Sequence, residues 1–109
     1  MLNISLWVDD IRDTPNDDRL WWHARSVNEA KRFIEGFENG LISPFGKFEL
    51  IDIDHDAGDY AKDGGDFIKL LEWLEETGRN YPIKIHTMNP VGAENMRKII
   101  RKNGWQEIV

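Results

Sequence analysis

Two kinds of segment alternate along this chain, and the first kind is a short run of apolar residues. Ile4–Val8 is apolar at almost every position, which is typical of a strand buried on both faces of a parallel sheet. Leu20–Ala24 is rich in tryptophan and predicts a second strand. Between them, Ile11–Arg19 contains the turn signal Thr14-Pro15-Asn16-Asp17. This segment of about ten residues is too short for an ordinary crossover helix, so we expect a loop.

The second kind of segment repeats apolar residues at helical spacing. The first helix is predicted to begin at the capping box Ser26-Val27-Asn28-Glu29 and to end at Asn39-Gly40. The second has an apolar stripe over residues 67–74 and ends near Gly78. The third begins at Asn89-Pro90, with asparagine as N-cap and proline at the first helical position, and ends at Asn103-Gly104.

Three further apolar runs complete the predicted sheet. They are Phe48–Asp54, Ile83–His86 and, as a short edge strand, Trp105–Val109. Strands that alternate with helices predict a parallel α/β sheet. We expect one domain, residues 1–109, in which a parallel sheet of about five strands lies between helices and the first crossover helix is lost or shortened.

Carboxylates follow two of the predicted strands directly. Asp9-Asp10 ends the first apolar run, and Asp54 ends the third. The carboxyl ends of parallel strands meet at one edge of the sheet, where open α/β folds place their sites. Carboxylates held close together repel one another, and they are the oxygen ligands that Mg²⁺ or Mn²⁺ prefers. We therefore predict that Asp9, Asp10 and Asp54 bind Mg²⁺ or Mn²⁺; the alternative is that Asp9 and Asp10 only cap the following turn.

Two histidines accompany these acids, and a histidine can give or take a proton near neutral pH. We predict catalytic roles for His55, His86 and Asp54; the alternatives are a capping role for His55 and a paired core histidine for His86. Side chains alternate along a strand, so Lys84 and His86 share one face of theirs. We prefer the register that sets His86 level with Asp54. It also sets Lys84 level with Asp52, and a buried aspartate without a partner is costly.

Two further features suit a phosphate group. Arg12 stands beside the acidic pair, where its guanidinium could contact a phosphate oxygen. Asn89 is the predicted N-cap of a helix whose first turn directs N–H groups toward the strand edge, which favours an anion. A group of aromatic and basic residues could also stack on a nucleotide, but strand packing is the interpretation we favour. This group is Trp21, Trp22, His23 and Arg25.

Composition narrows the functional classes. A net charge of −6 argues against broad charge-driven nucleic-acid binding but not against a small phosphorylated ligand held through a metal. The chain contains no cysteine, which rules out disulfides and thiolate metal sites and fits a reducing cytoplasm. No apolar run approaches the length of a membrane span, and the N-terminus lacks the pattern of a signal peptide. We expect a cytoplasmic domain without a membrane partner; the oligomeric state is open.

Several of these motifs resemble response-regulator receiver domains. Leu6-Trp7-Val8-Asp9-Asp10 is similar to the end of the receiver's first strand, and Leu50–Asp54 to the third strand, which ends at the aspartate that receivers phosphorylate. Ile83–Thr87 is similar to the fourth strand, and this resemblance implies a phosphate-binding role for Thr87. The lysine that receivers carry near the fifth strand has no counterpart in Gly104–Val109.

A more specific resemblance combines four motifs. They are Trp7–Arg12, Asp54-His55-Asp56, Ile85–Pro90 and Gly92-x-Glu94-Asn95-Met96. Together they resemble the cyclic-phosphate processing receiver domain family, which is derived from receivers. The resemblance implies a flavodoxin-like fold and an action on cyclic phosphate ends, and fold transfers between relatives more securely than function does.

The residues and the resemblance together predict a metal-dependent phosphoesterase that processes cyclic phosphates. Its partner would be a small phosphorylated ligand, a 2′,3′-cyclic nucleotide, or an RNA end bearing such a phosphate. Asp54 could also act as a transient nucleophile. Two alternatives stay open: a non-catalytic receiver-like switch or partner-binding module, and a protein that binds a cyclic nucleotide without turnover.

Overall fold

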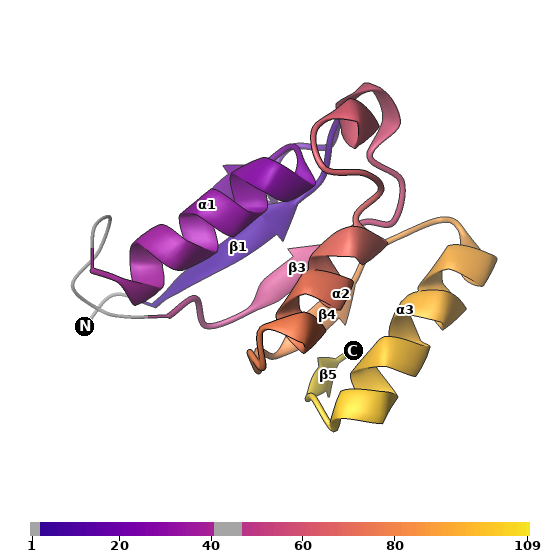
Figure 1. The fold of residues 1–109 in the computed structure, drawn as a ribbon. Helices are drawn as coiled ribbons and strands as arrows, with labels where there is room; N and C mark the ends of the chain where they lie inside the picture. The colour runs from indigo at the N-terminus through magenta and orange to yellow at the C-terminus, as the bar shows by residue number, and fades with distance from the viewer. Residues whose placement is uncertain (1–2, 41–46) are drawn as a thin grey trace.

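One sheet of five parallel strands forms the centre of the computed structural model, which describes residues 3–40 and 47–109 (Figure 1). The strands are β1 (Ile4–Val8), β2 (Leu20–Ala24), β3 (Ile51–Ile53), β4 (Ile83–Ile85) and β5 (Glu107–Ile108). They lie in the order β2-β1-β3-β4-β5 across the sheet. The helices of the described part are α1 (Val27–Glu38), α2 (Ile68–Glu76), α3 (Pro90–Asn103) and the 3₁₀ helix η1 (Gly58–Lys62).

The architecture confirms the predicted receiver-like α/β class. β1 and β2 have their predicted bounds, and residues 9–19, which join them and are all described, contain no helix. β3 is shorter than the predicted run of residues 48–54. The two residues before β3 nevertheless pair with β1. The Glu49 N–H donates to Ile4 O (2.9 Å), and the Leu6 N–H donates to Leu50 O (2.8 Å).

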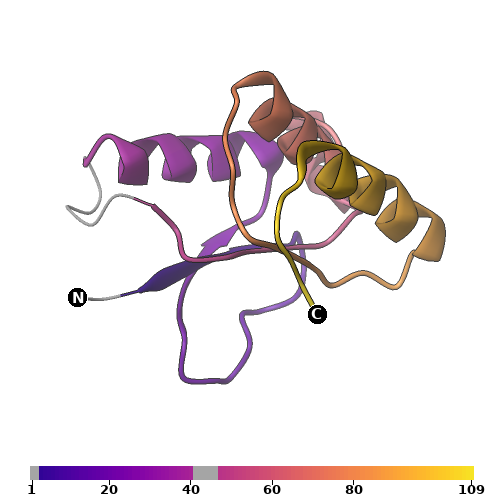
Figure 2. The same ribbon diagram turned by 90° about the horizontal axis from the view of Figure 1, so that it is seen from below.

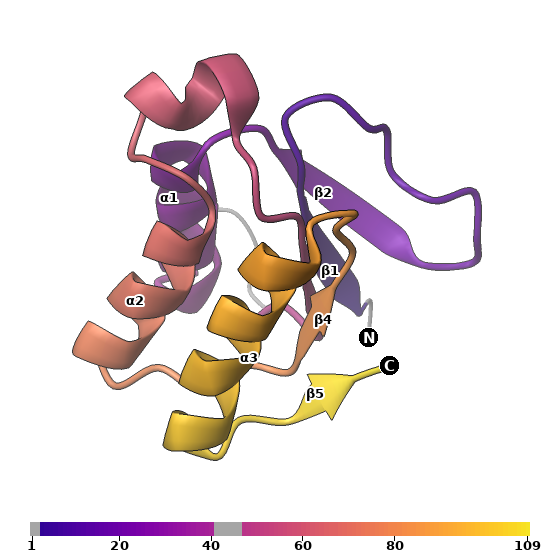
Figure 3. The same cartoon turned by 90° about the vertical axis from the view of Figure 1, so that its right-hand side faces the viewer.

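The three α-helices lie on the same face of the sheet (Figures 2 and 3). The loop of residues 9–19 projects from the opposite face. We expected helices on both faces; in the described residues this loop takes the place of the second layer, since so short a connection cannot contain a crossover helix. No helix in the described part of the chain is long and apolar enough to cross a membrane.

The core lies between the helices and the sheet. Leu6 and Val8 of β1 are fully buried there, with Ile51 and Ile53 of β3. Trp22 packs edge-on against Phe33 and Phe37 of α1, at ring-centroid distances of 5.1 and 5.0 Å. These contacts agree with the packing interpretation of Trp22.

Side chains at the predicted positions cap two of the helices. Ser26 Oγ accepts the Glu29 N–H (3.1 Å) at the start of α1, and Asn89 Oδ1 accepts the Gly92 N–H (2.9 Å) at the start of α3. The Glu29 carboxylate accepts the N–H of Arg25 (2.8 Å), the residue before the N-cap. Because α3 follows β4 closely, its capped first turn lies at the carboxyl edge of the sheet.

β3 and β4 pair in the register that we preferred. Asp52 is level with Lys84, and Ile53 is level with Ile85. The next residues along the two strands, Asp54 and His86, are therefore level with each other.

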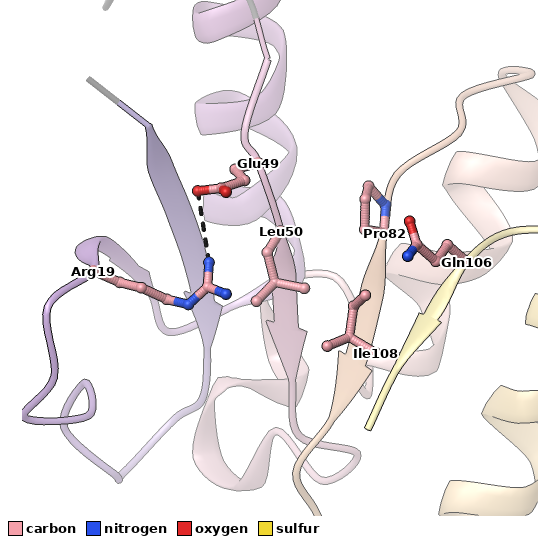
Figure 4. Close-up of a pocket in the computed structure, with 6 residues that line it drawn as sticks. All are labelled: Arg19, Glu49, Leu50, Pro82, Gln106 and Ile108. Atoms are coloured by element: carbon pink, nitrogen blue, oxygen red, sulfur yellow. Dashed lines mark ion pairs between the residues drawn. The ribbon is translucent and has the colours of Figure 1, made fainter. Parts of the chain in front are cut away.

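A pocket of about 250 Å³ lies at the amino ends of the strands, the opposite end from the acidic residues (Figure 4). Arg19 and Glu49 form an ion pair there, with 3.6 Å between Nη1 and Oε2. Its single carboxylate is thus already paired, so this pocket lacks the convergent ligating groups that a metal needs. The lining residues are Arg19, Glu49, Leu50, Pro82, Gln106 and Ile108.

Candidate functional site

Three carboxylates meet in one pocket at the carboxyl edge of the sheet. Asp9 and Asp10 follow β1, Asp54 follows β3, and one oxygen atom of each lies within 4.8 Å of the others. The strands themselves bring these acids together, because β1 and β3 are parallel neighbours and the Asp54 N–H donates to Val8 O (2.9 Å). The pocket encloses about 340 Å³. Its lining consists of Asp9, Asp10, Ile11, Arg12, Asp54, Asp56 and Gly58.

Repulsion within the cluster is concentrated on Asp10. Burial raises the pKa of Asp10, and the neighbouring carboxylates of Asp9 and Asp54 raise it further. Gly58 closes over this carboxylate so tightly that a Cβ at that position would collide with Oδ2 of Asp10. A divalent cation among the three carboxylates would remove the repulsion, so the donor set fits a hard metal ion such as those that receiver domains bind.

The chain holds the carboxylate of Asp9 from two sides. Its Oδ1 accepts the N–H groups of Ile11 (2.9 Å) and Arg12 (2.8 Å), and its Oδ2 faces His86 Nε2 at 2.8 Å. Burial alone would raise the pKa of Asp9, which is 1% exposed, but these hydrogen bonds lower it. Asp9 therefore stabilises the following turn, as our alternative proposed, and also belongs to the acidic cluster.

His86 lies between two carboxylates. Its Nδ1 is 2.6 Å from Asp52 Oδ1, and its Nε2 is 2.8 Å from Asp9 Oδ2. Although burial alone would lower it, the pKa of His86 is raised by Asp52 and Asp9. Each ring nitrogen therefore already has a carboxylate partner at hydrogen-bond distance, so neither is available to another group. We expected Lys84 to be the partner of Asp52; the register is as predicted, but the partner is His86.

His55 differs from His86 because one of its nitrogens stays available. Its ring Nδ1 lies 2.8 Å from Asp56 Oδ1, and the backbone N–H of His55 donates to Asp54 Oδ1 (2.7 Å). Among the described residues, no hydrogen bond to its Nε2 is present. The ring lies against the first turn of α3, where a Cβ built on Gly92 would be 2.5 Å from the His55 Cγ. His55 itself is outside the pocket lining and is linked to the pocket through Asp54 and Asp56.

The three predicted phosphate-binding residues lie in two places. Arg12 is exposed and lines the acidic pocket. Asn89 caps α3, and Thr87 Oγ1 accepts the Asn89 N–H (3.2 Å), so these two residues form the turn before α3. The structure thus gathers Asp9, Asp10, Asp54 and Arg12 in one pocket and leaves the predicted His55, His86, Thr87 and Asn89 outside its lining.

Sequence reasoning missed the part that β2 plays in this site. His23 Nε2 lies 2.7 Å from Asp9 O, and the Arg25 guanidinium donates to Asp10 O (3.0 Å). Both side chains therefore hold the backbone of the acidic pair instead of forming a nucleotide surface with the tryptophans. The pairing of β1 with β2 explains this placement, because it sets His23 level with Trp7, two residues before Asp9.

Comparison with known proteins identifies the family. The family model described as the cyclic-phosphate processing receiver domain matches residues 4–102. No curated protein and no solved structure gives a significant match to the chain. The matched region includes all of β1 to β4 and the whole acidic pocket, so the predicted resemblance is confirmed. The chain belongs to the cyclic-phosphate processing receiver domain family.

Proposed function

We propose that this protein is a metal-dependent phosphoesterase that opens a cyclic phosphate, on a 2′,3′-cyclic nucleotide or on the end of an RNA. The observation that supports this function best is the convergence of Asp9, Asp10 and Asp54 within 4.8 Å in a pocket that Arg12 also lines. Negatively charged ligands for Mg²⁺ or Mn²⁺ and a cationic side chain for the phosphate both favour phosphoryl chemistry. The name of the family agrees with this substrate class.

In this proposal Asp10 and Asp54 are the principal ligands of the cation. Asp9 is already engaged by the turn of residues 9–12 and by His86, so it contributes a fixed charge and one ligand position. When bound, a divalent cation supplies charge neutralisation at phosphoryl oxygens and activates water. Burial and, after it, the neighbouring carboxylates raise the pKa of Asp10, and such a cation would relieve the repulsion among them.

Arg12 and the start of α3 are the proposed phosphate contacts. The Arg12 guanidinium is exposed at the pocket and can donate two parallel hydrogen bonds to phosphate oxygens. Thr87 accepts a hydrogen bond from the Asn89 N–H, which leaves its hydroxyl hydrogen to donate to an anion. The positive end of the α3 dipole lies at the same edge of the sheet and also favours an anion there.

His55 is the residue we assign to proton transfer. In the hydrolysis of a 2′,3′-cyclic phosphate, the water oxygen forms a bond to phosphorus and one bond from phosphorus to a ribose oxygen breaks. The water loses a proton, and the departing ribose oxygen gains one. With its Nδ1 held by Asp56, the Nε2 of His55 can accept or return such a proton, whereas both nitrogens of His86 are occupied.

A second candidate function is binding of the cyclic phosphate without turnover. The observation that favours it is the position of both histidines outside the lining of the acidic pocket. A binding module needs the cation ligands and Arg12 but no group that transfers a proton.

Turnover separates the two functions. The purified protein is incubated with Mn²⁺ or Mg²⁺ and a 2′,3′-cyclic nucleotide or an RNA with a cyclic-phosphate end, and products are followed by ³¹P NMR. Metal-dependent ring opening that is lost in Asp54→Asn and strongly reduced in His55→Ala would support the enzyme. Saturable ligand binding without product would support the binding module, and the absence of both would refute the proposed function.

A further inference from the structure

We propose that Trp7 is a positioning residue of the acidic pocket, which fixes the imidazole of His86 and the turn of residues 9–12 and thereby places Asp9 and Arg12. This inference rests on the proposed function, because it concerns the same site. Trp7 belongs to β1 and precedes Asp9 by two residues, so both side chains are on the face of the strand opposite the helices. Trp7 is 6% exposed, which prevents direct contact with a bulky ligand and favours an indirect role.

The first contact of Trp7 is with the histidine that holds Asp9. The indole and the imidazole of His86 are stacked with their ring centroids 3.8 Å apart and their planes 2° from parallel. The indole covers one face of this imidazole, whose two nitrogens both face carboxylates, so Trp7 packs against the ring that links Asp9 to Asp52. The stack fixes the ring plane in which His86 Nε2 meets Asp9 Oδ2.

The second contact of Trp7 closes the turn that follows the acidic pair. The indole Nε1–H donates to Arg12 O (2.9 Å). The N–H groups of Ile11 and Arg12 in turn donate to Asp9 Oδ1, so one indole controls the groups on both oxygens of this carboxylate. The same hydrogen bond fixes the backbone from which the Arg12 side chain reaches the pocket.

One tryptophan side chain makes both contacts, the stack on His86 and the hydrogen bond to Arg12 O. Phenylalanine would keep an aromatic ring for the stack but lacks the N–H that Arg12 O accepts, and leucine lacks both. Trp21 packs edge-on against Trp7, at 5.5 Å and 77°, and limits the movement of the indole on its other side. The series Trp7, Trp7→Phe, Trp7→Leu therefore removes the two contacts one at a time.

The affinity for Mn²⁺ alone tests the proposal without any substrate. Isothermal titration calorimetry is performed on the full chain after chelator treatment, for the wild type, Trp7→Phe, Trp7→Leu and the matched control Trp22→Phe. Trp22 is on the neighbouring strand but faces the helices, outside this network. Trp7→Leu is expected to raise the Kd for Mn²⁺ by about tenfold, as loss of a residue that orients a ligand does, with Trp7→Phe in between and Trp22→Phe unchanged.

NMR provides a second measurement, which reports on Ile11, Arg12 and His86, the groups that Trp7 positions. In ¹⁵N-resolved NMR spectra without metal, Trp7→Phe is expected to shift the amide signals of Ile11 and Arg12, and Trp7→Leu to shift the ring nitrogens of His86 as well. Affinity and signals like those of the wild type in both variants would overturn the proposal. If the wild type itself fails to bind Mn²⁺, the proposed function is wrong, and the NMR series alone decides the role of Trp7. If Trp7→Leu does not fold, Trp7→Phe gives the decision through Ile11 and Arg12.

Discussion

Two groups of carboxylates at the same edge of the sheet are stabilised in opposite ways. Asp52 and Asp9 enclose the ring of His86, so the chain itself compensates their charge. Asp10 and Asp54 line the pocket and form no ion pair with another described residue, and burial together with the neighbouring carboxylates raises the pKa of Asp10. The chain thus neutralises the carboxylates that it buries most and leaves repulsion where solvent can supply a cation. We expect changes to the first group to affect folding and changes to the second to affect metal binding.

The largest loss in the free energy of unfolding is expected from His86→Leu, which removes the imidazole between Asp9 and Asp52. Asp9 and Asp52 would remain buried without their shared cation, and removal of one partner from a buried ion pair costs about 3–5 kcal/mol. Urea unfolding at neutral pH measures this loss. As a control, Lys84→Met changes a nearby cation that forms no ion pair among the described residues, and it should cost less than about 1 kcal/mol. An equal loss in the two variants would contradict the distinction between the groups.

Addition of Mn²⁺ tests the second group. At a concentration 100 times its Kd, the ion is expected to stabilise the wild type by about 2.7 kcal/mol, because it binds only the folded chain. Thermal unfolding with and without a chelator measures the gain. Asp54→Asn should lose most of it, since one of the three convergent carboxylates is neutralised. A full gain in Asp54→Asn would place the cation elsewhere.

Gly92→Ala tests how the first turn of α3 holds His55 beside the pocket of Asp10 and Asp54. An added Cβ would lie 2.5 Å from the imidazole, so the ring must move, and such overpacking costs about 1–3 kcal/mol. Chemical denaturation measures the cost. In the His55→Ala background the added methyl group has room, and the same substitution should then cost much less. Strictly additive effects in this double-mutant cycle would show that the two side chains do not compete for space.

Asp10→Asn in metal-free protein is expected to change the free energy of unfolding least. Unlike the other variants, it should stabilise the protein. The pKa of Asp10 is raised in the folded state, so its carboxylate opposes folding above that pKa, and the penalty disappears as falling pH protonates it. The variant should be more stable than the wild type at pH 7, by about 0.5–1 kcal/mol. The advantage should shrink as the pH falls through the raised pKa of Asp10, because the wild-type carboxyl then becomes neutral. Thermal melts across this range measure the difference, and a destabilised variant at neutral pH would contradict it.

Local patterns were sufficient to predict the helices, the strands and the parallel sheet, although not that the three described α-helices share one face of it. Apolar runs located β1 and β2 at their observed bounds, and Ser26 and Asn89 marked the starts of two helices because capping is a short-range interaction. The convergence of Asp9, Asp10 and Asp54 followed from a general property of parallel sheets, whose carboxyl ends meet at one edge.

The roles of the two histidines depended on contacts that spacing does not encode. Strand register places His86 level with Asp54, yet its side chain leans back along the strand to Asp52, where Trp7 supplies a ring to stack on. The space beside Gly92 that admits His55 likewise arises from the docking of α3 and not from any local signal. Rotamers and packed volumes of this kind are tertiary properties, so the sequence located the acids but could not distinguish the two histidines.

The direct connection between β1 and β2 also has a consequence for the order of folding. Ile4 pairs with Leu20, a sequence separation of sixteen residues (20 − 4), whereas a strand–helix–strand unit usually spans about thirty or more. The entropy lost on closing a loop grows with its length, by about 0.6 kcal/mol for each doubling. Contacts between β1 and β2 are therefore accessible early, before the longer connections to β3 and β4 close. The turn that carries the acidic pair is therefore placed beside β2 by a short connection, whereas Asp54 joins the pair only when the longer connection to β3 has closed.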